Sequence, residues 1–96
     1  MGINDLLKAR RDEILRIAAK HGARNVRIFG SVARGEDDEK SDVDFLVEMD
    51  ESSSLMDHAA LLVELEALLG RKVDVAPEDC IRPKMRDRVL KEAIPL

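Results

Sequence analysis

The sequence predicts an α/β (α+β) fold in which helices flank a small mixed β-sheet of three or slightly more strands. Three observations predict it. Helical and strand-like segments alternate along the 96 residues, the β-prone runs are short and end at glycine or polar clusters, and residues 42–49 place apolar side chains on one face of a strand. The expected order is α-β-α-β-α-β-α, with residues 1–96 forming a single domain.

The first helix is expected to begin near Asn4, whose side chain can cap it. Its apolar residues recur at helical spacing and form one stripe, made of Leu7, Ile14, Ile17 and Ala18. Gly22 suits the left-handed conformation that ends a helix. The β-prone run 24–29 then predicts the first strand.

The middle of the chain predicts a helical turn and a second strand. Gly30 and Ser31 break the first strand, and residues 32–34 form a helical turn that Gly35 closes. Residues 36–40 are polar and are expected to form a solvated connection. The second strand is residues 42–49, and its core face is made of Val43, Phe45, Val47 and Met49.

The C-terminal half predicts two helices with a strand between them. Ser54 can cap the first of these helices, and Asp57 completes a capping box. Its apolar face is made of Leu61, Leu62, Leu65, Leu68 and Leu69. Gly70 ends it, and residues 72–76 form the third strand. Pro83 suits the first turn of the last helix, whose core-facing residues are expected to be Met85, Val89 and Ala93.

Composition excludes some functions and compartments. The net charge is −4 and the chain has no Trp or Tyr, so direct binding of nucleic acid is not expected. Cys80 is the only cysteine, which allows no internal disulfide and is typical of a reducing compartment. We expect it to be a packing residue. No segment is typical of a signal peptide or a membrane span, which predicts a cytoplasmic protein without membrane contact.

Three aspartates are the candidate chemical residues. Asp42 and Asp44 lie two apart on a strand, so their side chains share a face. Asp74 stands between two valines and is also acidic on an otherwise apolar strand. If the two strands are neighbours, the three carboxylates converge, and an oxygen-only cluster prefers Mg²⁺ or Mn²⁺. The alternative is that Asp42 opens the strand at a turn and Asp44 merely faces water.

The turn at Gly30 and Ser31 predicts a phosphate site. Glycine lets the backbone approach a phosphate closely, and free N–H groups at a helix start point toward an anion. The serine hydroxyl adds another donor. Taken alone, the turn is better explained by a structural role of the glycine. A Walker A loop is excluded because Glu36 stands where that motif requires lysine.

Together, Gly-Ser-Val-Ala-Arg-Gly at 30–35 and Ser-Asp-Val-Asp-Phe-Leu-Val at 41–47 resemble the signature of polymerase-β-like nucleotidyltransferases. The short form with a lone third carboxylate resembles the minimal nucleotidyltransferases, which are antitoxins of HEPN-domain toxins. The resemblance extends from about Val26 to Val75, and the last helix is similar in character.

The resemblance implies a role for each matching position. Asp42, Asp44 and Asp74 would be the catalytic and metal-binding residues, holding two Mg²⁺ ions, with Mn²⁺ as an alternative. The nucleotide-binding residues would be Gly30, Ser31 and Arg34. The implied substrate is ATP, and the implied reaction transfers AMP to a tyrosine hydroxyl of a HEPN toxin partner. Arg34 is equally explained by a salt bridge to the acidic loop.

Two other functions remain open at this point. A binding module could neutralise its partner by contact alone, and a transferase could modify a small hydroxylated molecule. The sequence leaves homo-oligomers and hetero-oligomers open. The last helix is rich in basic residues, which predict a solvated face or a surface for an acidic partner: Arg82, Lys84, Arg86, Arg88 and Lys91. His21 and His58 are expected to lie on the surface.

Overall fold

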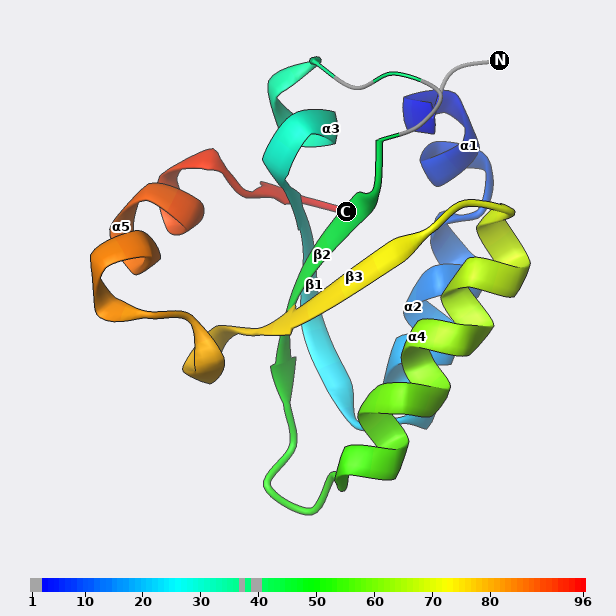
Figure 1. The fold of residues 1–96 in the computed structure, drawn as a ribbon. Coiled ribbons are helices and arrows are strands. Elements are labelled where there is room, and N and C mark those ends of the chain that lie inside the picture. Colours follow the sequence, from blue (N-terminus) through cyan, green and yellow to red (C-terminus); the bar gives the residue numbers. More distant parts are fainter. Residues whose placement is uncertain (1–2, 37, 39–40) are drawn as a thin grey trace.

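The computed structural model describes residues 3–36, 38 and 41–96. Its elements follow one another along the chain as shown in Figure 1. They are α1 (Ile3–Ala9), α2 (Arg11–Lys20), β1 (Ala23–Phe29), α3 (Gly30–Arg34), β2 (Val43–Met49), α4 (Leu55–Leu69), β3 (Val73–Pro77), the 3₁₀ helix η1 (Glu78–Cys80), α5 (Pro83–Glu92) and β4 (Ile94–Pro95).

The strands form one mixed sheet in the order β3-β2-β1-β4. Strands β2 and β3 are parallel and are connected through α4, whereas β1 runs antiparallel to both β2 and β4. The predicted α/β class is confirmed, and the sheet has one strand more than the three that periodicity indicates. Strand β4 has only two residues, Ile94 and Pro95, which is too short to produce an alternating pattern.

The main core lies between the sheet and the helices α1, α2 and α4, which gather on one side of it (Figure 1). The predicted core face of β2 is confirmed, because Val43, Phe45 and Val47 are at most 1% exposed. Leu46 points to the opposite face and is nevertheless fully buried. Val89 of α5 is also buried, and α5 lies on that opposite side (Figure 1). Both faces of β2 are therefore covered near its middle.

The helix boundaries follow the predicted capping chemistry. The Ser54 hydroxyl accepts a hydrogen bond from the Asp57 N–H at 3.2 Å, and the Asp57 carboxylate accepts one from the Ser54 N–H at 3.0 Å. This reciprocal pair is the capping box. Gly35 and Gly70 adopt left-handed conformations at the ends of α3 and α4.

The first helix differs from its prediction. Asn4 lies inside α1 instead of capping it, and the helix is divided at Arg10 into α1 and α2. Hydrogen bonds continue on both sides of the division, from the Arg10 N–H to the Leu6 carbonyl and from the Ile14 N–H to the Arg10 carbonyl. The bend lets the apolar stripes of both short helices reach the core.

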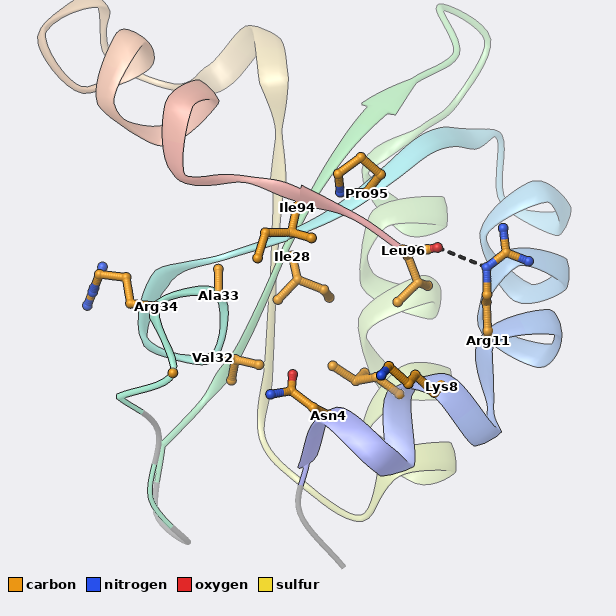
Figure 2. A pocket seen from close by; sticks show the side chains of 12 residues that line it. Asn4, Lys8, Arg11, Ile28, Val32, Ala33, Arg34, Ile94, Pro95 and Leu96 are labelled. Atoms are coloured by element: carbon orange, nitrogen blue, oxygen red, sulfur yellow. Dashed lines mark hydrogen bonds between the residues drawn. The ribbon is translucent and has the colours of Figure 1, made fainter.

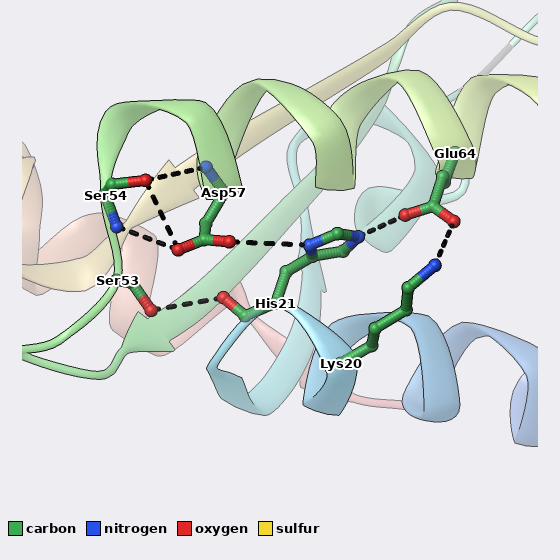
Figure 3. Close-up of polar contacts among 6 residues, drawn as sticks. All are labelled: Lys20, His21, Ser53, Ser54, Asp57 and Glu64. Atoms are coloured by element: carbon green, nitrogen blue, oxygen red, sulfur yellow. Dashed lines mark hydrogen bonds and ion pairs between the residues drawn. The ribbon is translucent and has the colours of Figure 1, made fainter.

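Three further side chains are placed differently from expectation. Met85 is 52% exposed, because the first turn of α5 projects beyond the sheet (Figure 1). Cys80 is exposed on η1 and is not a packing residue. His21 is mostly buried, with 11% of its side chain exposed. It lies between two carboxylates of α4 (Figure 3).

His58 also departs from the expected surface position. It is half-buried, and its Nε2 lies 2.8 Å from the Val75 carbonyl oxygen of β3. Of the polar connection predicted at 36–40, Glu36 and Asp38 are exposed, and Asp37, Glu39 and Lys40 lie outside the described residues. Within the part of the chain that the structure describes, every helix is too short or too polar to cross a membrane.

Candidate active site

Asp44 and Asp74 lie side by side on the parallel strands β2 and β3, where they are register partners. Their neighbours Val43 and Val73 are also partners, and both valines point into the core. Because side chains alternate along a strand, both aspartates project from the face opposite the core. The predicted adjacency of the second and third strands is confirmed.

Asp42 directly precedes β2 and is exposed. The segment before it is held by Arg71, whose Nη2 donates to the Ser41 and Asp38 carbonyls, each at 2.7 Å. The strand itself begins with a hydrogen bond of 2.9 Å from the Val43 N–H to the Lys72 carbonyl. These contacts fix the entry to β2, two residues before Asp44.

The electrostatics of Asp44 reflect its crowded position. Burial, together with the negative charges of Asp74 and Asp42, raises the pKa of Asp44 to about 6. The nearby Arg34 guanidinium lowers the pKa of Asp44, and the Glu92 carboxylate raises it further. Burial is thus the main reason that Asp44 holds its proton more tightly than a free aspartate, and the neighbouring acids add to it.

Gly30 begins α3 directly against Asp44. Its φ is +74°, a left-handed conformation that favours glycine. A Cβ atom at this position would overlap the Asp44 carboxylate. The next residue, Ser31, is half-buried, and its hydroxyl has no hydrogen-bond partner in the described part of the chain. The glycine is required both by its backbone angle and by the neighbouring acid.

Glu92, at the end of α5, is a site residue that the sequence reading missed. Its Oε2 accepts a hydrogen bond from the Gly30 N–H at 3.0 Å, and its Oε1 accepts one from Arg34 Nη1 at 2.7 Å. The N–H of Gly30 is therefore engaged, contrary to the expectation of a free donor. The expected bridge from Arg34 to the acidic loop also exists, with Arg34 Nε donating to Glu36 at 3.0 Å.

A weak signal for Glu92 was present in the sequence. It is an acid that follows a run of basic positions in the last helix, yet it lies 62 residues from Gly30. Nothing in local periodicity links two positions so far apart. Only the packing of α5 beside α3 brings them together.

The site can be tested for its fit to a divalent cation. Across residues 3–36, 38 and 41–96, no three His, Cys, Asp or Glu side chains are gathered closely enough to hold a metal ion. The available donors are nevertheless carboxylate oxygens, which Mg²⁺ prefers. Burial, and after it the negative charges of Asp74 and Asp42, raises the pKa of Asp44, so a bound cation would offset repulsion between neighbouring carboxylates. The donor chemistry at Asp42, Asp44 and Asp74 therefore fits a hard cation that would draw the carboxylates together.

An apolar groove of about 520 Å³ lies beside α3, between α1 and β4 (Figure 2). Its charged lining residues are all basic: Lys8, Arg11 and Arg34. Arg11 Nε donates to the Leu96 carbonyl at 2.8 Å across one end of it. None of the three aspartates lines this groove. It is therefore separate from the acidic site, although Arg34 borders both.

Comparison with known proteins supports this description. A family model described as "Nucleotidyltransferase domain" matches residues 11–96. The "Putative protein adenylyltransferase MJ0435" of Methanocaldococcus jannaschii is 45% identical to this chain. The alignment covers 98% of this chain and 97% of that protein. "Protein adenylyltransferase MntA" of Thermococcus cleftensis is 37% identical over 96% of this chain and 90% of its own.

Solved structures show the same fold. One described as a "putative minimal nucleotidyltransferase" has a TM-score of 0.89 and 51% identity, covering 100% of this chain and 97% of its own. A toxin–antitoxin structure with AMP-PNP has a TM-score of 0.75 at 17% identity, covering 88% of this chain and 69% of that one. The second likeness concerns the fold alone.

Proposed function

Because the chain belongs to the nucleotidyltransferase domain family and is a nucleotidyltransferase, we propose that it transfers AMP from ATP to a partner toxin and thereby acts as an antitoxin. The proposed acceptor is a tyrosine hydroxyl of a HEPN-domain protein. The observation that carries the proposal is the pairing of Asp44 with Asp74 in front of Gly30. Relatives that match nearly the whole chain are named protein adenylyltransferases.

The reaction requires one bond to form and one to break at the α-phosphorus of ATP. The acceptor oxygen attacks that phosphorus, the bond to the bridging oxygen of the β-phosphate breaks, and pyrophosphate departs. Asp74 is the proposed acceptor of the hydroxyl proton, because it is exposed beside the more buried Asp44. Mg²⁺ held by Asp42, Asp44 and Asp74 would neutralise phosphate charge and stabilise the attacking and leaving oxygens.

The proposed phosphate ligands are the backbone at Gly30, the hydroxyl of Ser31 and the guanidinium of Arg34. Three facts support them. Gly30 has no side chain to separate a phosphate from Asp44, the Ser31 hydroxyl is free within the described residues, and Arg34 lies close enough to lower the pKa of Asp44. Donors of this kind bind an anion without a rearrangement of the strands.

The decisive experiment combines the chain with ATP, Mg²⁺ and a candidate HEPN-domain partner protein. Wild type should add the mass of one or more AMP groups to that protein and suppress its toxicity. Asp44→Asn should do neither, because the neutral side chain is a poor ligand for a divalent cation. Asp87→Asn, an exposed acid on α5, is the matched control and should behave as wild type.

The result also separates the enzyme from a module that neutralises by contact. If Asp44→Asn suppresses toxicity as well as wild type does, catalysis is dispensable and contact alone is the function. If wild type leaves the partner unmodified, the acceptor assignment is wrong.

A further inference from the structure

Glu92 holds two of the groups that are proposed to bind phosphate. One carboxylate oxygen accepts from the Gly30 N–H at 3.0 Å and the other from Arg34 Nη1 at 2.7 Å. An anionic phosphate oxygen would need the same donors. The Gly30 N–H has one hydrogen, so it cannot serve the carboxylate and a phosphate at the same time, and the Arg34 Nη1 hydrogen that points at Glu92 is likewise unavailable to a phosphate.

The contact is well placed to persist in the nucleotide-free chain. The Glu92 side chain is only 16% exposed, and the hydrogen bond from Arg34 holds the pKa of Glu92 below its usual range, with the Gly30 N–H acting in the same direction. Glu92 therefore remains ionised at neutral pH. Its negative charge lies near Asp44 and helps to raise the pKa of that residue. The Glu92 carboxylate is thus held by hydrogen bonds from Gly30 and Arg34 and is repelled by the negative charge of Asp44.

Glu36 provides an internal comparison. It also accepts from Arg34, through Nε at 3.0 Å, but its side chain is 67% exposed and Glu92, not Glu36, accepts from Gly30. Both glutamates thus partly compensate the positive charge of the same arginine. Only Glu92 also blocks the backbone donor beside Asp44.

We propose that Glu92 is a built-in competitor of the nucleotide phosphates, which occupies Gly30 and Arg34 until a triphosphate displaces it. This inference rests on the proposed function, since that assigns Gly30 and Arg34 to phosphate. Displacement requires a ligand that replaces two charge-assisted hydrogen bonds at once. A ligand must therefore carry enough phosphate groups to replace both hydrogen bonds of Glu92. This requirement favours the binding of a triphosphate over that of a single phosphate group.

The test follows the Gly30 backbone amide by NMR while inorganic tripolyphosphate is added without metal. Wild type, Glu92→Gln and Glu36→Gln are compared at about pH 7.5, roughly three pH units above the ordinary pKa of a glutamate carboxyl. Removing the competing charge should lower the half-saturating concentration of Glu92→Gln about tenfold, since a larger fraction of molecules is then open. Glu36→Gln should stay within about twofold of wild type. The same substitution should lower the half-saturating concentration of orthophosphate less than that of tripolyphosphate.

A second variant distinguishes competition by Glu92 from a loss of local structure. Glu92→Asp keeps the charge but is one methylene shorter, so it cannot reach both donors, and its half-saturating concentration should fall between those of wild type and Glu92→Gln. Equal values for wild type and Glu92→Gln, or weaker binding by Glu92→Gln, would show that Glu92 only joins α5 to α3. Equal gains from both glutamine variants, or no response of Gly30 in any protein, would also overturn the inference.

The two proposals fail in different ways. If tripolyphosphate binds Glu92→Gln more tightly but wild type transfers no AMP to its partner, the competitor stands and the transfer reaction is wrong. If wild type transfers AMP and the half-saturating concentrations do not differ, only the competitor is wrong.

Discussion

Gly30 lies so close to Asp44 that a Cβ atom on the glycine would overlap the aspartate carboxylate. The glycine also has a φ of +74°. Two independent constraints thus meet at one position. The first of them, the contact with the carboxylate, joins the turn after β1 to the acidic residue of β2, so the turn and the acid are parts of one site.

Substitution at Gly30 should therefore affect both stability and nucleotide binding. We expect Gly30→Ala to lose about 1–2 kcal/mol from the left-handed conformation alone, and additionally to displace the Asp44 side chain. Gly70→Ala is the matched control, because Gly70 has a φ of +64° with open space around it. Both variants should unfold at lower urea concentration, but only Gly30→Ala should lose ATP binding in calorimetry. Unchanged binding by Gly30→Ala would contradict the shared site.

Metal binding should depend on the acidic face of the sheet. Mn²⁺ is expected to broaden the NMR signals of residues near Asp44 in wild type, since a hard cation seeks clustered carboxylate oxygens. Asp44→Asn and Asp74→Asn should each weaken Mn²⁺ binding at least about tenfold. Asp87→Asn, on exposed α5, should bind as wild type does. Broadening centred away from β2 and β3 would place the cation elsewhere.

The raised pKa of Asp44 predicts a pH dependence of stability in the metal-free chain. Its reference value is 3.8 and its folded value about 6, so the folded chain binds the proton more tightly than the unfolded chain. The stabilisation is complete below about pH 4 and is lost as pH rises through about 6, by roughly 1–2 kcal/mol after allowance for solvent screening.

Asp44→Asn removes this ionisation and gives the direct measurement. In EDTA at about pH 8 the variant should unfold at higher urea concentration than wild type, because it carries no repelled charge. The difference should shrink as the pH falls from about 6 and vanish at about pH 3, where Asp44 is largely protonated in both the folded and the unfolded chain. A constant difference across this range would assign the effect to packing instead.

His21 should join α2 to α4 without influencing the site. Its Nε2 contacts Glu64, its Nδ1 lies 3.7 Å from Asp57, and its own carbonyl accepts from the Ser53 hydroxyl (Figure 3). We expect His21→Ala to lower the free energy of unfolding by about 1–3 kcal/mol, because the side chain is mostly buried. Lys20→Ala is the control, since Lys20 also bonds Glu64 but is exposed.

Nucleotide binding distinguishes this role from a role in the site. At a temperature where both proteins are folded, His21→Ala should bind ATP as wild type does. A loss of binding in calorimetry would show that the contact between α2 and α4 also shapes the acidic face.

Local patterns determined much of this protein. Alternation along β2 separates Val43 and Phe45 from Asp42 and Asp44 whatever the rest of the chain does, because successive side chains point to opposite faces of a strand. The capping box at Ser54 is equally local, since its two hydrogen bonds span three residues. The α/β class and the family resemblance both follow from such short-range features.

Tertiary structure alone decided which residues meet. Asp44 and Asp74 become neighbours only because β2 and β3 pair in parallel with this register. Glu92 reaches Gly30 because α5 returns to α3 from 62 residues away. Neither contact is visible in the periodicity of the sequence. Helix and strand patterns depend on neighbours along the chain, whereas the positions of distant elements depend on how the whole core packs.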